Sequence, residues 1–179
     1  MSKGMSDAAT GKRVKVVAEK ISRVHSEILV LGIFQDVRPM VGPAGDIDWM
    51  HNGILSRLIL RNKMRGAVGE ATLLAGQRKL NAPKIMIVGL GNKDRFTPEV
   101  VREVYSYVYR TLALMHIKDC AVELFTQSNS IQESARAVEA MVQGFQDDGE
   151  RRIEALLLIP DEERARRIER HLDSLTGNA

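Results

Sequence analysis

Short apolar runs alternate with longer stretches of mixed apolar and polar residues along most of this chain. Six of the runs have the length of β-strands and are bounded by polar residues, Gly or Pro. They lie at residues 14–18, 27–34, 70–75, 84–89, 121–125 and 153–159. The run at 27–34 is continuously apolar after its first residue, which is typical of a strand buried on both faces. The pattern therefore predicts six strands.

Helix-start signals precede the stretches between several of these runs. The expected N-cap residues are Asp46, Thr97, Ser130 and Asp161. Thr97 is followed by a proline and a glutamate, which suit a first turn because proline needs no N–H partner there and an acid favours the positive helix end. Ser130 matches a capping box with Glu133. The first of these helices is expected to run from Asp46 through Leu58, because apolar residues recur there at helical spacing.

Strands that alternate with helices favour an α/β fold in which helices cover both faces of a sheet. We therefore predict a three-layer α/β/α sandwich whose six-stranded sheet is mixed but largely parallel. Residues 1–12 are small or polar without periodicity and are expected to form a mobile leader. Residues 13–179 are expected to form a single domain, because no linker or repeat interrupts them.

The composition predicts a globular protein of the cytoplasm. Its 179 residues are 44% hydrophobic, which is enough to build a core. The single cysteine, Cys120, permits no disulfide within the chain and no thiolate cluster for a metal. The sequence shows neither a secretory signal nor an apolar run of membrane-spanning length. We therefore expect a cytoplasmic protein without a membrane partner.

The net charge of +3 is too small to indicate nucleic-acid binding by itself, but the charge is unevenly distributed. Residues 57–84 contain seven basic residues and one acidic residue. Two interpretations remain open for this segment, a solvated surface or contact with an anionic partner such as DNA. The residues expected at such a contact are Arg57, Arg61, Lys63 and Arg65.

One tract of the sequence carries a family resemblance. Lys-Ile-Met-Ile-Val-Gly-Leu-Gly-Asn-Lys at 84–93, followed by Thr-Pro-Glu-Val-Val-Arg at 97–102, resembles the signature strand, glycine turn and helix of the N-terminal domain of leucyl aminopeptidases. Residues 28–36 and the Gly-Ala-Val-Gly-Glu step at 66–70 resemble earlier parts of that domain, and 139–145 resembles the helix that leads out of it. The resemblance covers roughly residues 14–159.

This resemblance implies a macro-like fold, because the family is similar to macro domains. It also implies that the two-metal site of the full-length enzymes, held by a lysine and several carboxylates, belongs to a separate C-terminal domain with an Asn-Thr-Asp-Ala-Glu-Gly-Arg motif. This chain contains no such motif and ends where that domain would begin. We therefore expect a non-catalytic binding or assembly module without a metal or other cofactor. The family's oligomers, and DNA binding by some bacterial members, imply self-association, another protein or DNA as partners.

The glycine turn at 89–92 is an alternative functional feature, a candidate site for a phosphate-bearing ligand. It lies between the carboxyl end of a predicted strand and a helix N-terminus, where backbone N–H groups can hold an anion. Analogy with macro domains makes ADP-ribose the first ligand to test. The other interpretation is that the glycines only form the turn. The residues proposed for the site are Gly89, Leu90, Gly91, Asn92, Lys93, Arg95 and Thr97.

No residue pattern in the sequence indicates catalysis or metal binding. The histidines lack the spacing of a metal site, and no serine lies in the turn that presents a nucleophile in hydrolases. The histidines of the chain are His25, His51, His116 and His171. The acidic residues Asp36, Asp46 and Asp48 are expected to serve turns and caps.

Overall fold

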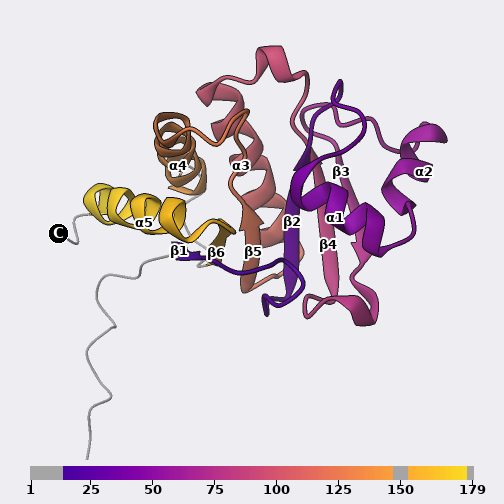
Figure 1. The fold of residues 1–179 in the computed structure, drawn as a ribbon, viewed down its shortest axis with the longest axis horizontal. Helices are drawn as coiled ribbons and strands as arrows, with labels where there is room; N and C mark the ends of the chain where they lie inside the picture. The colour runs from indigo at the N-terminus through magenta and orange to yellow at the C-terminus, as the bar shows by residue number, and fades with distance from the viewer. Residues whose placement is uncertain (1–13, 147–152, 177–179) are drawn as a thin grey trace, which may run out of the picture.

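The computed structural model describes residues 14–146 and 153–176, whose strands form one sheet (Figure 1). The strand order is β1-β6-β5-β2-β4-β3, and every neighbouring pair is parallel except β4 and β3. The strands are β1 (Val14–Val17), β2 (Ile28–Ile33), β3 (Ala71–Ala75), β4 (Lys84–Gly89), β5 (Asp119–Glu123) and β6 (Glu154–Leu158). The prediction of a mixed, largely parallel, six-stranded sheet is confirmed.

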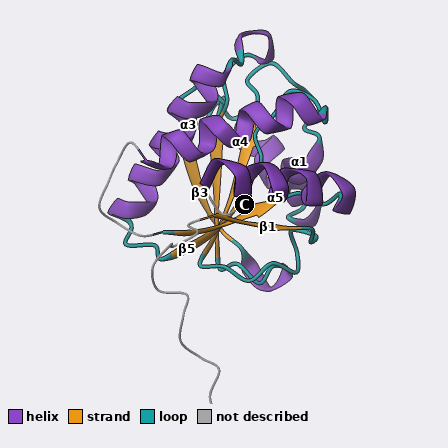
Figure 2. Cartoon of the chain, turned by 90° about the vertical axis from the view of Figure 1, so that its left-hand side faces the viewer, coloured by secondary structure: helices purple, strands orange, loops and turns teal. Residues whose placement is uncertain are grey.

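Helices cover both faces of this sheet. They are α1 (Gly42–Met50), α2 (Ile54–Leu60), α3 (Pro98–Leu114), α4 (Ile131–Gln146) and α5 (Glu162–Thr176). The last three each follow a parallel strand and pack on one face, while α1 and α2 follow β2 and pack on the other. Figure 2 shows α1 and α3 on opposite sides of the strands. The predicted three-layer arrangement is therefore confirmed.

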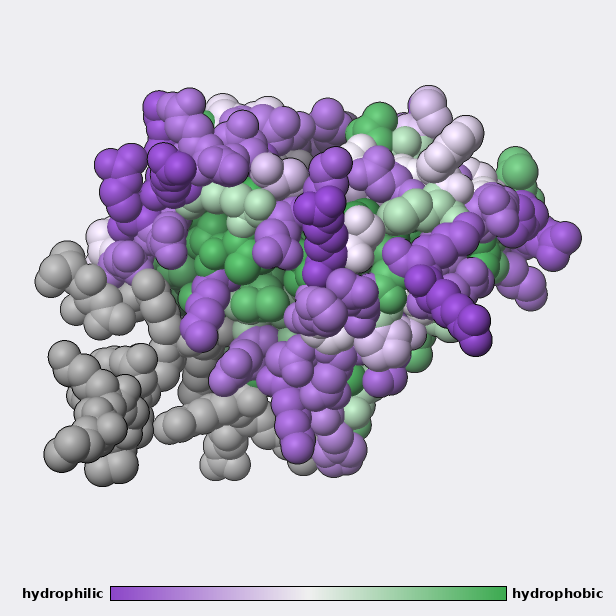
Figure 3. All heavy atoms as spheres, turned by 60° about the horizontal axis from the view of Figure 1, so that its bottom comes forward, coloured by the Kyte–Doolittle hydropathy of each residue, from purple (hydrophilic) through white to green (hydrophobic). Residues whose placement is uncertain are grey.

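The sheet separates two hydrophobic cores. The larger lies under α3, α4 and α5, where the buried rings of Tyr105 and Phe125 stack with centroids 4.7 Å apart. The smaller lies under α1 and α2 and takes alternate residues of β2, such as Leu29. On this second face Val17 and Leu156 are only half-buried. Apolar surface is visible when the molecule is seen from below (Figure 3).

The single helix predicted from Asp46 through Leu58 is two helices. Asp46 is not an N-cap, because α1 already begins at Gly42 with Val41 in the N-cap position. The proline at position 43 explains this earlier start, since its fixed φ and missing N–H suit the first turn of a helix. The helical spacing of apolar residues continued past the real end of α1 and hid the break.

The break between α1 and α2 has a backbone cause. Asn52 and Gly53 adopt the left-handed region, with φ of 54° and 74°. The Oδ1 atom of Asp48 then accepts hydrogen bonds from the backbone N–H groups of Leu55 at 2.7 Å and Ser56 at 3.0 Å. Asp48 therefore has the capping role expected of it, and the helix that it caps is α2.

The other three predicted helix starts agree with the structure, since α3, α4 and α5 begin directly after Thr97, Ser130 and Asp161. The Ser130 hydroxyl accepts the N–H of Glu133 at 3.2 Å, and Asp161 accepts the N–H of Arg164 at 2.7 Å. Thr97 occupies its N-cap position without a side-chain bond to the helix backbone.

Three smaller expectations had different outcomes. β5 ends at Glu123 rather than at residue 125, because the chain leaves the parallel ladder there and Phe125 binds the Tyr105 hydroxyl instead. The stretch 139–145 lies within α4, and β6 of the same sheet follows it rather than an exit from the domain. The predicted leader, residues 1–12, lies outside the described residues.

Candidate functional site

A cleft opens at the edge of the sheet where the parallel strands β2, β5 and β6 end. Its volume is about 530 Å³, within the range of small-molecule sites in proteins. The loop after β2, the start of α1, the loop after β5 and the first turn of α5 form its walls. Ligands of open α/β sheets usually bind at the carboxyl ends of adjacent parallel strands, so this cleft is the leading candidate site.

Glu123 and Asp161 are the acidic residues that line the cleft, and Glu123 is the one that lies on a strand. It is the last residue of β5, and its Oε2 atom accepts the backbone N–H of Gly32, on β2, at 3.2 Å. Burial raises the pKa of this carboxyl group to about 7, although the Gly32 bond and the positive charge of Arg164 act in the opposite direction. Near neutral pH the group exists in both protonation states. It can therefore either donate a hydrogen bond to a ligand or accept one.

Arg164, in the first turn of α5, and Lys93 are the basic residues that line the cleft. The Nε atom of Arg164 donates to Ser134 Oγ at 2.9 Å, its Nη1 to Asn129 Oδ1 at 2.7 Å, and its Nη2 to Thr126 Oγ1 at 3.4 Å. Burial lowers its pKa, and neighbouring carboxylates oppose that shift. A guanidinium group carries five N–H donors, so donors remain for a ligand after these three bonds. The bonds fix the orientation of the group before any ligand arrives.

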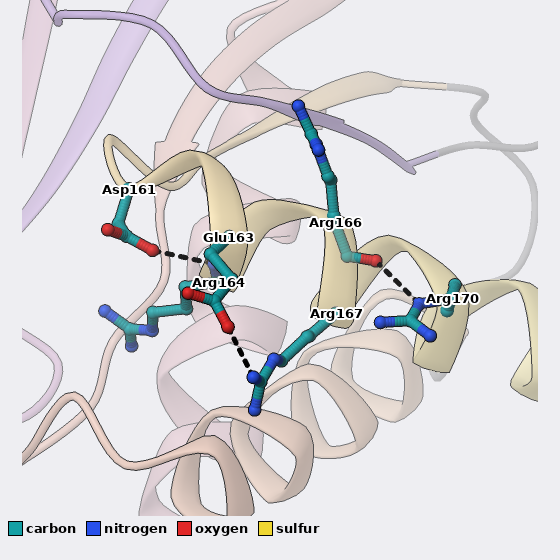
Figure 4. Close-up of polar contacts among 6 residues, drawn as sticks. All are labelled: Asp161, Glu163, Arg164, Arg166, Arg167 and Arg170. Carbon is teal, nitrogen blue, oxygen red and sulfur yellow. Dashed lines mark hydrogen bonds and ion pairs between the residues drawn. The ribbon is translucent and has the colours of Figure 1, made fainter.

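The other arginines in the first half of α5 serve the helix surface. Arg166 and Arg167 form ion pairs with Glu162 and Glu163, one turn earlier on the same helix. Three of these side chains are largely exposed to solvent, and 42% of the Arg167 side chain is accessible. Figure 4 shows Arg164 directed away from Arg166 and Arg167, and Arg164 is the arginine of α5 that lines the cleft.

The wall formed by the loop after β5 is held from two sides. The Tyr105 hydroxyl, on α3, donates to the carbonyl of Glu123 at 2.8 Å and accepts the N–H of Phe125 at 3.0 Å. Glu133, on α4, accepts the N–H of Ser128 at 3.1 Å and also binds the Ser128 hydroxyl. Buried and charged partners of this kind keep the loop in one conformation, so the cleft is largely preformed.

The glycine turn lies beside the cleft, and three of its backbone donors are already engaged. The N–H groups of Gly89, Leu90 and Gly91 bind the carbonyl oxygens of Glu70, Ile33 and Gly66 respectively, each at 2.9 Å. A Cβ atom at Gly89 would lie 1.9 Å from the carbonyl oxygen of Ala67. The glycines thus allow the 66–70 loop to pack directly on the turn, as the purely structural interpretation requires.

The Gly-Ala-Val-Gly-Glu step at 66–70 is also explained by backbone bonds. The Oε2 atom of Glu70 accepts the N–H groups of Arg65, Gly66 and Ala67 at 2.9, 2.6 and 3.2 Å. Gly66 and Gly69 have φ of 88° and 80°, a region that favours glycine. This loop is therefore organised around a single carboxylate.

Among the seven residues expected at the turn, two line the cleft, namely Leu90 and Lys93. The backbone of Lys93 also joins two walls, since its N–H donates to Asp36 Oδ1 at 3.0 Å and its carbonyl accepts a bond from the Gln127 side chain. Thr97 instead lines a smaller pocket of about 330 Å³ between the starts of α3 and α4. The remaining four, Gly89, Gly91, Asn92 and Arg95, are not among the residues that line the cleft.

The basic residues of the predicted anionic contact lie elsewhere, on α2 and the turn that follows it. All four side chains are exposed, and they are Arg57, Arg61, Lys63 and Arg65. None of them lines the cleft. The structure therefore keeps the two sequence-predicted features apart.

The described residues contain no group of three or more His, Cys, Asp or Glu side chains placed to hold a metal ion. Within the same residues no helix is long and apolar enough to cross a membrane. His51 is buried, and its Nδ1 and Nε2 atoms lie 3.0 Å from the carbonyl oxygen of Ile47 and 3.2 Å from that of Gly76. Both ring nitrogens thus face backbone partners.

The sequence-based site did not include Glu123 or Arg164. A signal existed for Glu123, which interrupts an apolar strand run with a charged side chain near its carboxyl end. No comparable signal marked Arg164, because four arginines and three glutamates lie close together at 162–170. The two residues are far apart along the chain and both line this cleft only because β5 and β6 are neighbours in the sheet.

Residues 30–150 match the family described as the cytosol aminopeptidase family, N-terminal domain. A probable cytosol aminopeptidase of Alkaliphilus metalliredigens is 26% identical over 132 residues, which are 74% of this chain and 26% of that protein. One of Burkholderia lata is 32% identical over 87 residues, 49% of this chain and 17% of that protein. This chain thus spans about a quarter or less of the length of these relatives.

Solved structures show the same fold at low identity. A tomato leucine aminopeptidase variant has a TM-score of 0.63 and 15% identity, covering 97% of this chain and 37% of that one. A macrodomain variant of Oceanobacillus iheyensis has a TM-score of 0.71 and 14% identity, covering 93% of this chain and 94% of that one. The same macrodomain was solved with ADPR and with ADP. The expected macro-like fold is confirmed.

Proposed function

Because this chain belongs to the family of cytosol aminopeptidase N-terminal domains, we propose that it is a non-catalytic module that binds a small ligand in the cleft at the carboxyl edge of its sheet. One observation carries the proposal. Glu123 and Arg164 both line a preformed cleft, and each is held in place by hydrogen bonds to neighbouring elements. A carboxyl group with a shifted pKa that lies near a fixed cation in a concave site is typical of ligand binding.

The chemistry of the cleft favours a ligand that carries an anion and hydroxyl groups. The planar guanidinium of Arg164 suits phosphate or carboxylate oxygens, and Lys93, which also lines the cleft, adds a second positive charge. The carboxyl group of Glu123 suits a hydroxyl or amine. A phosphorylated sugar satisfies both demands. ADP-ribose is the first candidate, since the macrodomain neighbours were solved with ADPR and ADP.

This proposal gives the glycine turn a supporting role. Its Leu90 and Lys93 contribute to the cleft, whereas its glycine N–H groups hold the turn against the 66–70 loop. In this proposal the side chains of Arg164 and Lys93, rather than the backbone N–H groups of the turn, bind the anion. The names of the curated relatives also support a cytosolic location.

Calorimetric titration and a thermal-shift series with ADP-ribose, ADP and inorganic phosphate test the proposal. A ligand at 100 times its dissociation constant adds about 2.7 kcal/mol to the free energy of unfolding. We expect a rise in melting temperature for the parent protein and for Arg166→Met, and loss of that rise in Arg164→Met. Absence of binding at millimolar ligand, or equal binding by both variants, would remove the cleft from consideration.

DNA binding is a second candidate function, supported by a different surface. The four exposed cations at 57, 61, 63 and 65 lie on one short segment, α2 and the turn after it. Exposed cations in a continuous segment can contact successive phosphates, and such binding weakens steeply with salt. The two candidate functions are separable, because the basic segment and the cleft share no residue.

A further inference from the structure

The outer edge of β3 is an exposed strand edge. β3 is the last strand of the described sheet, and β4 is its neighbour on the inner side. At its two ends Gly89 N–H binds the Glu70 carbonyl, and Gly76 N–H binds the Pro83 carbonyl, each at 2.9 Å. Along an antiparallel strand, residues whose backbone N–H and C=O groups bond to the neighbouring strand alternate with residues whose backbone groups point to the opposite side. The backbone groups of the odd-numbered residues, Ala71, Leu73 and Ala75, therefore point away from β4.

The side chains of these residues leave the edge accessible. Ala71, Leu73 and Ala75 are all exposed, and 54% of Leu73 is accessible to solvent. The alanines are small enough to let another strand approach. The strand contains no proline and no charged residue, which are the usual devices that protect an edge from pairing. An unprotected edge with an exposed leucine at its centre is suited to adding a strand.

The odd-numbered residues of β3, Ala71, Leu73 and Ala75, are symmetric about the centre of the strand. In an antiparallel pair with a two-fold axis at Leu73, that residue lies opposite its own copy, and Ala71 lies opposite the partner's Ala75. These are the residues whose backbone groups face outward, so each pair can exchange both N–H···O bonds. We infer that two copies of this chain associate through β3, joining their sheets edge to edge.

The composition of β3 is compatible with a second copy as the occupant. The strand contains no charged side chain, so no like charges lie opposite each other when the same strand of two copies is paired. The interface is separate from the cleft, and its existence does not depend on the proposed ligand.

A five-residue strand buries less than the roughly 1,600 Å² of a standard interface, so we expect a dimer that dissociates on dilution. Sedimentation equilibrium from micromolar to near-millimolar protein measures it. We expect concentration-dependent dimers for the parent and monomers for Leu73→Lys, which places a charge at the centre of the contact. Leu114→Lys is the matched control, because Leu114 is 81% exposed on α3. It should dimerise like the parent.

A disulfide trap tests the register independently and does not rely on a charged variant. Opposed residues of a hydrogen-bonded antiparallel pair have Cα atoms about 5.5 Å apart, within disulfide range. Under mild oxidation Leu73→Cys should form a covalent dimer, and Leu114→Cys should not. The native thiol gives no background, because Cys120 is fully buried and burial raises its pKa to about 12.

Each outcome decides the inference. Loss of dimers in Leu73→Lys alone, together with cross-linking in Leu73→Cys alone, supports it. A parent that stays monomeric at the highest concentration, dimers that persist in Leu73→Lys, equal loss in Leu114→Lys, or equal cross-linking of the two cysteine variants overturns it.

Discussion

The carboxyl group of Glu123 accepts the backbone N–H of Gly32 and so joins the carboxyl ends of β5 and β2 at the floor of the cleft. The residue that closes this junction is ionisable, and burial raises its pKa to about 7. The stability of the domain and the chemistry of its cleft are thereby linked to the same proton.

This link predicts a pH-dependent gain in stability for Glu123→Gln. Below pH 4.5 the carboxyl group is protonated in both the folded and the unfolded chain. Between pH 4.5 and about 7 it ionises in the unfolded chain first, so the parent loses stability as pH rises, by up to roughly 3 kcal/mol. Glutamine can still accept the Gly32 bond and has no such loss.

Urea unfolding of parent and variant at pH 4 to 8 measures the difference. The free energy of unfolding of Glu123→Gln should rise relative to the parent across this window and level off above it. Glu154→Gln, at an exposed position of β6, serves as the matched control. If the difference in stability between Glu123→Gln and the parent did not change with pH, the raised pKa of Glu123 in the folded protein would be contradicted.

Arg164→Met should destabilise the domain even without ligand. The substitution removes three side-chain bonds and leaves the fully buried Ser134 hydroxyl without its donor. A buried acceptor that loses its partner costs about 1–3 kcal/mol. Arg166→Met removes only an exposed pair with Glu162 at 3.6 Å and should change stability by less than about 1 kcal/mol. Equal effects in chemical denaturation would show that the Arg164 bonds contribute nothing.

Gly89→Ala should prevent normal folding or cost several kcal/mol, because the new Cβ would overlap the Ala67 carbonyl oxygen. Gly42→Ala is the contrasting variant. Its position has φ of 65° and open space around a Cβ, so only backbone strain of about 1–2 kcal/mol is expected. Thermal melts followed by circular dichroism compare the two, and a milder effect at Gly89 than at Gly42 would refute the close packing of the turn.

Charge reversal on the basic segment separates DNA binding from the cleft. If DNA contacts this segment, the triple change Arg61→Glu, Lys63→Glu and Arg65→Glu should abolish binding and the parent's salt dependence. Each phosphate contact contributes about −0.9 to the slope of log affinity against log salt. Fluorescence anisotropy with a duplex measures both. Binding that survives the triple change would exclude this segment, and ADP-ribose binding should be unaffected in either case.

Comparison of prediction and structure shows which signals are local. The bounds of β4 and the start of α3 were predictable, because a buried strand and a proline-led helix start depend on residues adjacent in sequence. The division of α1 from α2 was missed because apolar spacing ran through the left-handed Asn52 and Gly53, whose effect is a backbone property rather than a hydropathy signal. The end of β5 was misplaced because a bond from the backbone of Phe125 to Tyr105, on another element, decides it.

The sequence by itself determined the succession of strands and helices along the chain, the three-layer class and the family resemblance. Each of these rests on short-range periodicity and on motifs of neighbouring residues. Only the tertiary structure decided the cleft. Glu123 and Arg164 line it because the strand order places β6 beside β5, and that order depends on long-range packing. The glycine turn illustrates the same division. Its residues were recognisable in sequence, but the carbonyl groups that occupy its donors come from β2 and from the 66–70 loop, which only folding brings to it.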